Sequence, residues 1–246
     1  MSTTLIDPRQ EAVAPPAPAV DTTAVRASGL QLDGTRGRIY GPVDLDIAPA
    51  TLNLVTGPSG SGKTSLLLTL VGRMRPNRGS DLVVLGRQLP ARATGVQRRS
   101  AAVGVHGLDD LDEEVTVAAA VREREAWLAR WYRIVRTPDD GRVAEVCSQV
   151  FGRNDLPRAR QLIHQLDETS NLQLRLALAM LSDPELVVVD DIDALHDTDS
   201  RRLVWESLRT LTEHGVTVIA SASTDRELSR LGWDTLPTHL ALPAVA

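Results

Sequence analysis

Gly57-Pro58-Ser59-Gly60-Ser61-Gly62-Lys63-Thr64 has the spacing G-x-x-x-x-G-K-[ST], and this stretch decides how the rest of the chain is expected to fold. An apolar run, residues 51–56, precedes it, and a helical pattern over residues 64–74 follows it. Strand, glycine-rich turn and helix in this order form a phosphate-binding loop, where backbone N–H groups and the helix dipole face an anion. The stretch predicts that ATP binds from Gly57 to Ser65.

Lysine occurs once in this chain, although lysine and arginine together number 27. The single lysine is Lys63, inside the predicted phosphate-binding loop. A compact ammonium can reach between the β- and γ-phosphates, whereas a planar guanidinium does not fit there. Lys63 is therefore expected to hold phosphate.

An acidic residue at the end of a buried strand is the second element that such a site requires, because it holds Mg²⁺ directly or through water. Leu186-Val187-Val188-Val189 is a continuous apolar run, typical of a strand buried on both faces, and Asp190 follows it. We expect the Thr64 hydroxyl and the Asp190 carboxylate to hold Mg²⁺.

The remaining pattern predicts an α/β domain over residues 25–242. Apolar residues alternate through residues 30–47, as in half-buried antiparallel strands. Further strands are predicted at 82–85, 101–105, 216–220 and 235–242, the last as an edge strand, and helices at 172–181, 201–211 and 226–231. Residues 1–24 are rich in Pro, Ala and Thr, and we expect a disordered arm.

A helical insert is predicted from about residue 111 to 170, with helices at 117–135, 143–151 and 158–164. Trp127, Trp131 and Tyr132 lie on neighbouring turns of the first helix, where they either form a docking surface or pack a small core of the insert. The acidic run at 109–114 is expected to be a solvated loop.

The composition limits which classes of partner and which cellular location are expected for this chain. The net charge of −5 argues against a general nucleic-acid binder, so no nucleic acid is expected as a partner. No segment approaches the roughly 20 apolar residues of a membrane span, and the N-terminus lacks the pattern of a secretory signal. Cys147 is the one cysteine, which suits a reducing compartment.

The order of these features resembles the nucleotide-binding subunit of ATP-binding cassette (ABC) transporters, over about residues 25–242. Asp183-Pro184-Glu185-Leu186 through Asp191 is similar to the family's "DPELLLLDE", and Gly104-Val105-His106 is similar to the segment that opens the insert. The resemblance implies a P-loop NTPase fold, with an ABC-type ATPase core, an antiparallel β subdomain and a helical insert.

The resemblance also implies cofactors and partners. ATP and Mg²⁺ would be the cofactors, and a transmembrane permease subunit would be the partner. Two ATP-binding subunits would form a homodimer or a heterodimer that closes on ATP. The chain would be cytoplasmic and peripheral on the inner face of the cell membrane.

Several positions depart from the family pattern. The signature LSGGQ is replaced by Leu166-Asp167-Glu168-Thr169-Ser170, which brings negative charge towards a polyanion. The catalytic glutamate becomes Asp191, one methylene shorter, and the family's glutamine and switch histidine become His106 and Ser223. We expect these three residues to take the catalytic roles, and Mg-ATP to be bound but hydrolysed slowly or not at all by this subunit alone.

Two alternatives remain open. The chain could be a non-transport ABC-type ATP sensor that regulates a complex, in which case it would co-purify with a soluble partner. A P-loop small-molecule kinase is the other alternative, because GPSGSGKT also occurs in nucleoside-monophosphate kinases. Those enzymes carry an arginine-rich lid, and Arg98-Arg99 is poor support for one. Asp190 also argues against a kinase, because it lies far from Lys63 in the sequence.

Overall fold

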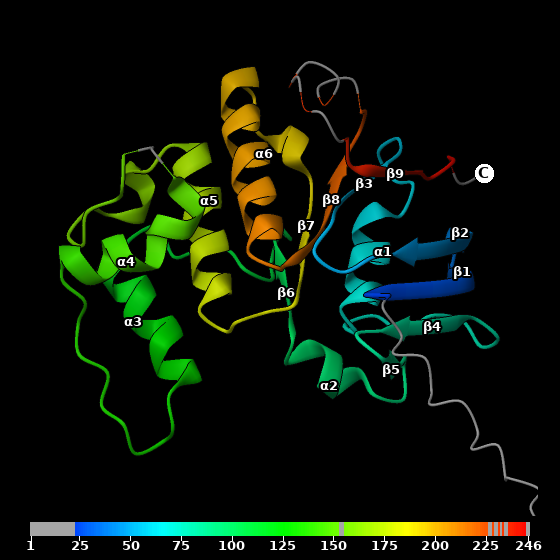
Figure 1. The fold of residues 1–246 in the computed structure, drawn as a ribbon, viewed down its shortest axis with the longest axis horizontal. Helices are drawn as coiled ribbons and strands as arrows, with labels where there is room; N and C mark the ends of the chain where they lie inside the picture. Colours follow the sequence, from blue (N-terminus) through cyan, green and yellow to red (C-terminus); the bar gives the residue numbers. More distant parts are fainter. Residues whose placement is uncertain are drawn as a thin grey trace, which may run out of the picture.

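A parallel β-sheet forms the centre of the molecule (Figure 1). The computed structural model describes residues 23–152, 155–225, 228, 231, 233 and 236–244. The sheet has the order β6-β7-β8-β3-β9, and all neighbouring strands are parallel. Its strands are β6 (Ser100–Val103), β7 (Leu186–Val189), β8 (Thr217–Ala222), β3 (Leu52–Thr56) and β9 (Thr238–Ala241).

The three inner strands are buried along their whole length, because both faces of the sheet are covered. Side chains alternate between the faces, as the pleat of a strand requires. In β7, Val187 and Val189 join one hydrophobic core, while Leu186 and Val188 join the other. The apolar residues of β7, directly before Asp190, therefore pack into both hydrophobic cores.

One face of the parallel sheet is covered by α1 (Lys63–Leu70) and a second, antiparallel sheet, on the right in Figure 1. This sheet has the order β2-β1-β4-β5. Its strands are β1 (Val25–Gly34), β2 (Gly37–Ile47), β4 (Asp81–Val84) and β5 (Arg87–Gln88). The fold class expected from the sequence, an α/β core with an antiparallel β subdomain, is confirmed.

Helices cover the opposite face, on the left in Figure 1. They are α3 (Val117–Leu128), α4 (Asp140–Phe151), α5 (Glu168–Met180) and α6 (Thr198–Glu213), and the short α2 (Ala93–Gln97) leads into β6. The structure also describes the 3₁₀ turns η1 (Ile163–Gln165) and η2 (Ile192–Ala194). Among the described residues, no helix is both long and apolar enough to cross a bilayer.

Two of the predicted helices were wrong in part. The helix predicted to reach residue 135 ends at Leu128, because Ala129 has an extended backbone with φ −72° and ψ 154°. Residues 158–162 form no helix, because their backbone bonds instead to the start of α3, where Ala118 N donates to Ala159 O and Val117 N to Gln161 O. These pairings join residues about forty positions apart in the sequence.

Helix α5 begins at Glu168, one turn earlier than the predicted start at residue 172, because Asp167 caps it. The Asp167 carboxylate accepts a hydrogen bond from Ser170 N at 2.6 Å. The predicted arm, apart from residues 23–24, and most of the helix predicted at 226–231 lie outside the described residues.

Candidate nucleotide site

The site lies where three neighbouring parallel strands end. In the sheet, β3 pairs with β8 and β8 pairs with β7, so their carboxyl ends are adjacent. Thr56 at the end of β3 leads into the glycine-rich loop, Val189 leads to Asp190, and Ala222 leads to Ser223. Adjacent strand ends in an α/β sheet are the usual position of a ligand site.

The glycines of the loop are required by close contacts. A Cβ at Gly57 would lie 2.5 Å from Ser61 Oγ and 2.8 Å from the Leu242 carbonyl oxygen. A Cβ at Gly62 would lie 2.3 Å from the Ile39 carbonyl oxygen, and Gly62 also has a φ of +86°. The backbone can therefore take this compact path only with glycine at both positions.

The polar groups of the loop fit a triphosphate. Lys63 Nζ donates to the carbonyl oxygens of Gly57 at 2.7 Å and Pro58 at 3.1 Å, so its charge lies across the loop. Ser61 Oγ is buried and has no hydrogen-bond partner within the described part of the chain. The N-terminus of α1 has no side-chain cap, which leaves its first N–H groups available to an anion.

The predicted magnesium ligands are in direct contact. The Thr64 hydroxyl donates to Asp190 Oδ2 at 2.5 Å, and Asp190 is buried. Ser221, which the sequence reasoning missed, donates from its hydroxyl to the other carboxylate oxygen, Oδ1, at 2.5 Å. The same hydroxyl accepts a hydrogen bond from Asp191 N at 2.9 Å. Ser221 thus fixes the orientation of Asp190, and a polar residue inside the apolar run of β8 was the signal for it.

Asp191 lies beside this pair in a left-handed backbone conformation, φ 50° and ψ 59°, which aspartate tolerates better than most residues. Burial raises the pKa of Asp191 above its ordinary value, and the neighbouring carboxylates of Asp190 and Asp193 raise it further. The Lys63 ammonium opposes this shift. Asp191 is therefore a carboxylate that takes up a proton more readily than a free aspartate.

The other two predicted catalytic side chains are placed differently. The His106 side chain is fully exposed, and its Nδ1 lies 3.3 Å from Asp110 Oδ2. A hollow of about 440 Å³ next to Asp190 and Asp191 is lined without His106. Ser223 donates from its backbone N–H to the Asp193 carboxylate, which attaches the end of β8 to η2.

An ion pair holds the loop that carries His106. Arg175 of α5 donates from Nε and Nη2 to the two carboxylate oxygens of Asp109, at 2.8 and 2.5 Å. Asp109 also accepts from Gly104 N at 2.9 Å. The side chains of Arg175 and Asp109 are only 15% and 18% exposed, so the prediction of a solvated acidic loop was wrong for Asp109.

The positive end of α5, where the family signature would meet phosphate, is already neutralised within this chain. Asp167 accepts the Ser170 N–H, as described above, and Glu168 follows in the first turn. His196 Nδ1 lies 3.2 Å from the Glu168 carboxylate. Carboxylates at a helix N-terminus satisfy its dipole and its free N–H groups, so they oppose the approach of a second anion.

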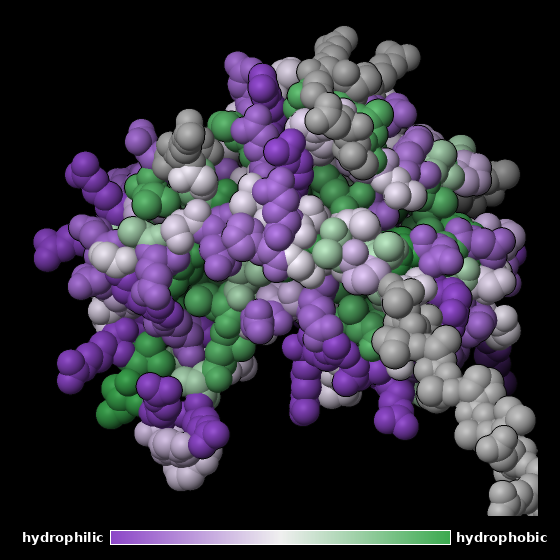
Figure 2. Space-filling model, in the orientation of Figure 1, coloured by the Kyte–Doolittle hydropathy of each residue, from purple (hydrophilic) through white to green (hydrophobic). Residues whose placement is uncertain are grey.

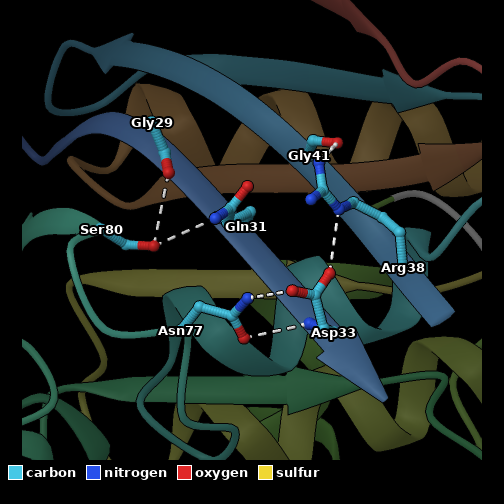
Figure 3. Close-up of polar contacts among 7 residues, drawn as sticks. All are labelled: Gly29, Gln31, Asp33, Arg38, Gly41, Asn77 and Ser80. Atoms are coloured by element: carbon cyan, nitrogen blue, oxygen red, sulfur yellow. Dashed lines mark hydrogen bonds and ion pairs between the residues drawn. The ribbon is translucent and has the colours of Figure 1, made fainter. Parts of the chain in front are cut away.

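Tyr40 is the one aromatic residue among those that line the hollow beside the loop, within the described part of the chain, and its ring offers almost no exposed face on which a base could stack. Tyr40 is buried, its hydroxyl donates to Thr69 Oγ1 at 2.7 Å, and burial raises its pKa to about 12. The hollow, of about 400 Å³, is lined by Arg38 and Ser61 among others. Figure 3 shows the Arg38 guanidinium held by Asp33, with Arg38 Nε 2.9 Å from Asp33 Oδ1.

Comparisons with known proteins agree with this geometry. The ABC transporter family model matches residues 40–194, more than half of the chain. The Nod factor export ATP-binding protein I of Mesorhizobium japonicum is 28% identical over 213 residues, which cover 87% of this chain and 60% of that protein. Its counterpart in Cupriavidus metallidurans is 29% identical over 209 residues, covering 82% and 65%. The chain spans less than two thirds of the length of these relatives.

Solved structures show the same fold. The ADP conformation of an ATP-binding cassette of an ABC transporter has a TM-score of 0.69 at 13% identity, over 91% of this chain and 90% of that one. The dimeric structure of a bacterial ABC transporter cassette has a TM-score of 0.65 at 19% identity, over 89% and 94%. With the family model matched across the phosphate loop and Asp190, the chain belongs to the ABC transporter family and has the fold of its ATP-binding cassette.

Proposed function

We propose that this chain is the ATP-binding subunit of an ABC transporter, that it binds Mg-ATP, and that it hydrolyses ATP slowly without a partner. The observation that carries the proposal is the hydrogen bond of 2.5 Å between Thr64 Oγ1 and Asp190 Oδ2. It supports a shared magnesium site next to a loop that already presents a free helix N-terminus and an unpartnered Ser61 hydroxyl.

The residues from Gly57 to Ser65 would hold the phosphates, with Lys63 supplying the positive charge. Thr64 and Asp190 would hold Mg²⁺, which would supply positive charge beside the phosphates during phosphoryl transfer. Thr64 and Asp190 are the residue types that Mg²⁺ prefers, and Ser221 keeps the carboxylate in one orientation. Asp191, which follows Asp190 directly, would polarise the attacking water.

Slow hydrolysis is supported by three features of the chain. Asp191 has a raised pKa and a side chain one methylene shorter than glutamate. His106 points to Asp110 instead of the site, and Asp167 caps the helix that would meet the γ-phosphate of a partner. A misplacement near 1 Å can cost on the order of 10²-fold in rate, so these features together favour ATP retention.

The permease would dock on a groove of about 520 Å³ between the insert and α2. The groove is lined by Arg98, Leu108 and Arg124 among others. The names of the relatives from Mesorhizobium japonicum and Cupriavidus metallidurans indicate export, and an exporter subunit on the inner face of the cell membrane is the corresponding assignment for this chain. Closure of a homodimer or heterodimer on ATP would then move the permease.

The test is calorimetric titration of the purified chain with ATP, with Mg²⁺ and with a chelator. Lys63→Ala should weaken ATP binding by about ten- to a hundredfold, because it removes hydrogen bonds from a charged donor. Lys63→Arg, which keeps the charge, should also weaken binding, because a guanidinium does not fit between the phosphates. ATP binding that is equal in all three proteins would refute the site.

A regulatory ATP sensor is the second candidate function, favoured by the capped N-terminus of α5. The two functions differ in the partner. Affinity purification from membranes solubilised in detergent should recover a protein with several membrane spans if the chain serves transport. Recovery of a soluble complex without such a protein would favour the sensor.

A further inference from the structure

A ten-residue segment from Trp127 to Arg136, which covers the end of α3 and the chain that follows it towards α4, contains much of the aromatic surface of this protein. The chain has four tryptophans, two tyrosines and one phenylalanine, and this segment holds Trp127, Trp131 and Tyr132. Trp131 is 96% exposed, Ile134 93% and Trp127 78%. We call this segment the aromatic–arginine loop. Of the two alternatives drawn from the sequence, a docking surface or packing in a core of the insert, this exposure contradicts the packing of Trp127, Trp131 and Tyr132 in a core.

The loop lies below α3 at the lower left of Figure 1, away from both sheets. Figure 2 shows green apolar residues next to purple hydrophilic residues in this lobe. Its turn is fixed by backbone contacts, because Arg122 Nε donates to Val135 O at 3.1 Å and Arg133 N donates to Arg130 O at 2.8 Å. The exposed rings are therefore carried by an ordered turn and project into solvent.

The loop is positively charged in a protein whose net charge is −5. Arg130, Arg133 and Arg136 alternate with the apolar residues, and the segment contains no acidic residue. The nearest acidic side chains have partners in the structure. Glu125 pairs with Arg142 at 2.7 Å, Asp139 accepts from Arg142 N at 2.9 Å, and Asp140 accepts from Ala159 N at 2.6 Å.

A hollow of about 430 Å³ lies behind the turn. Arg133 and Arg136 line it together with the apolar side chains of Leu128 and Ile134, and the ion pair of Glu125 with Arg142 also lines it. Two guanidinium groups beside an apolar wall match a phosphate group joined to an acyl chain, because guanidinium binds phosphate oxygens in a planar, bidentate arrangement.

We propose that the aromatic–arginine loop docks on the surface of an anionic lipid bilayer. Tryptophan and tyrosine rings prefer the headgroup layer, where one end of the ring is apolar and the other is hydrated. Arginine side chains between them gain from the negative surface potential of anionic lipids. Trp127 also lines the groove proposed for the permease, so the structure assigns the lipid contact chiefly to Trp131, Ile134 and the arginines of the loop, beside that groove.

A bilayer fits this loop better than a protein partner. A stable protein interface needs a partner surface of roughly 800 Å² that is shaped to match. A few rings and basic side chains suffice for binding to a lipid interface, because the headgroup layer surrounds each side chain separately. A protein partner would also leave the fully exposed Trp131 and Ile134 unpaired unless it carried a matching pocket.

The test is co-sedimentation of the purified chain with vesicles, without nucleotide, so that its outcome is independent of the proposed ATP site. Vesicles of phosphatidylcholine alone are compared with vesicles that also contain about a third phosphatidylglycerol. The wild type should bind the anionic vesicles at least about tenfold more strongly, because each arginine near such a surface contributes about fivefold. Tryptophan fluorescence should shift to shorter wavelength on binding.

Two variants separate the contributions. Trp131→Ala/Ile134→Ala should lose about tenfold or more in binding to both vesicle types, because it removes the inserted apolar area. Arg133→Gln/Arg136→Gln should lose about tenfold for anionic vesicles only. The matched control is Arg36→Gln/Arg78→Gln, two exposed arginines outside this loop, which should bind as the wild type does. Circular dichroism checks that each variant is folded.

Equal binding of the wild type to both vesicle types, or none to either, overturns the proposal. So does a loop variant that binds anionic vesicles as tightly as the wild type. Binding that falls to the same degree in the Arg36/Arg78 control also overturns it, because the attraction would then be a property of the whole surface.

Discussion

Ser221→Ala tests whether one buried hydroxyl organises the magnesium side of the site. In the structure this hydroxyl donates to Asp190 Oδ1 at 2.5 Å and accepts from Asp191 N at 2.9 Å, and Ser221 is fully buried. A hydrogen bond to a charged group contributes about 1.5–3 kcal/mol, and a buried N–H left without an acceptor costs about 1–3 kcal/mol. We expect the variant to lose about 2–4 kcal/mol of unfolding free energy.

For a domain of this size, each kcal/mol corresponds to about 2–4 °C in melting temperature, so Ser221→Ala should melt about 5–15 °C lower. The same variant should bind Mg-ATP about tenfold more weakly, because Asp190 loses the contact that orients it, while ATP binding without Mg²⁺ should change little. Scanning calorimetry measures the first effect and titration with and without chelator the second.

Ser148→Ala is the matched control. Its hydroxyl is exposed and donates only to Glu145 O at 2.9 Å, so this variant should stay within about 0.5 kcal/mol of the wild type. A melting temperature of Ser221→Ala equal to that of Ser148→Ala would refute the role of the Ser221 hydroxyl. A stability loss without any loss of Mg-ATP affinity would leave Ser221 a packing residue and remove its role in orienting Asp190.

Four further predictions concern the Asp191 carboxylate, the ion pair of Asp109 and the hollow lined by Arg38. Asp191→Glu should raise steady-state phosphate release by about tenfold or more, because the longer side chain restores reach of about 1 Å, and an unchanged rate would place the block elsewhere. Burial and nearby carboxylates raise the pKa of Asp191 above 3.8. Residual hydrolysis by the wild type should therefore decline on acidification before pH 3.8 is reached. A hydrolysis rate that stays unchanged down to pH 3.8 would contradict this. Asp109→Asn should lower the unfolding free energy by about 2–3 kcal/mol, because the largely buried Arg175 loses its bidentate partner and keeps only the longer contact of 3.5 Å to Asp110. Faster amide exchange across residues 104–110 should accompany this loss. Arg38→Ala should weaken ATP binding about two- to fivefold and leave tripolyphosphate binding unchanged, because the Arg38 guanidinium would lie against the adenine base. Equal losses of affinity for both ligands would argue against that contact.

The sequence predicted the parts of the site that depend on neighbouring residues. The glycine spacing, Lys63 and the strand before Asp190 are local patterns, and the close approach of the Ile39 carbonyl to Gly62 gives the physical reason for one of the glycines. The antiparallel β subdomain was also predicted from a local pattern, the alternation of apolar and polar residues through residues 30–47. The pleat of a strand fixes which side chains are buried, so this alternation is visible in the sequence.

The parts that were missed depend on pairs of residues far apart in the chain. Ser221 meets Asp190 only because β8 pairs with β7, and Asp109 meets Arg175 only because the loop after β6 packs on α5. Residues 158–162 have a helical pattern, yet their backbone groups bond to α3 instead. In each case a tertiary contact outweighs the local preference, and no single-sequence pattern records the partner.

The central claim is that this chain binds Mg-ATP and retains it unsplit when no partner is present. The most direct test loads the purified chain with labelled ATP and Mg²⁺, isolates the complex, and follows the ratio of ATP to ADP over time. Enzymes commonly turn over about once per second or faster, so a working ATPase would convert the bound nucleotide within seconds. We predict that most of the bound label remains ATP after many minutes. Conversion to ADP within seconds, or failure to recover any bound nucleotide, would contradict the account.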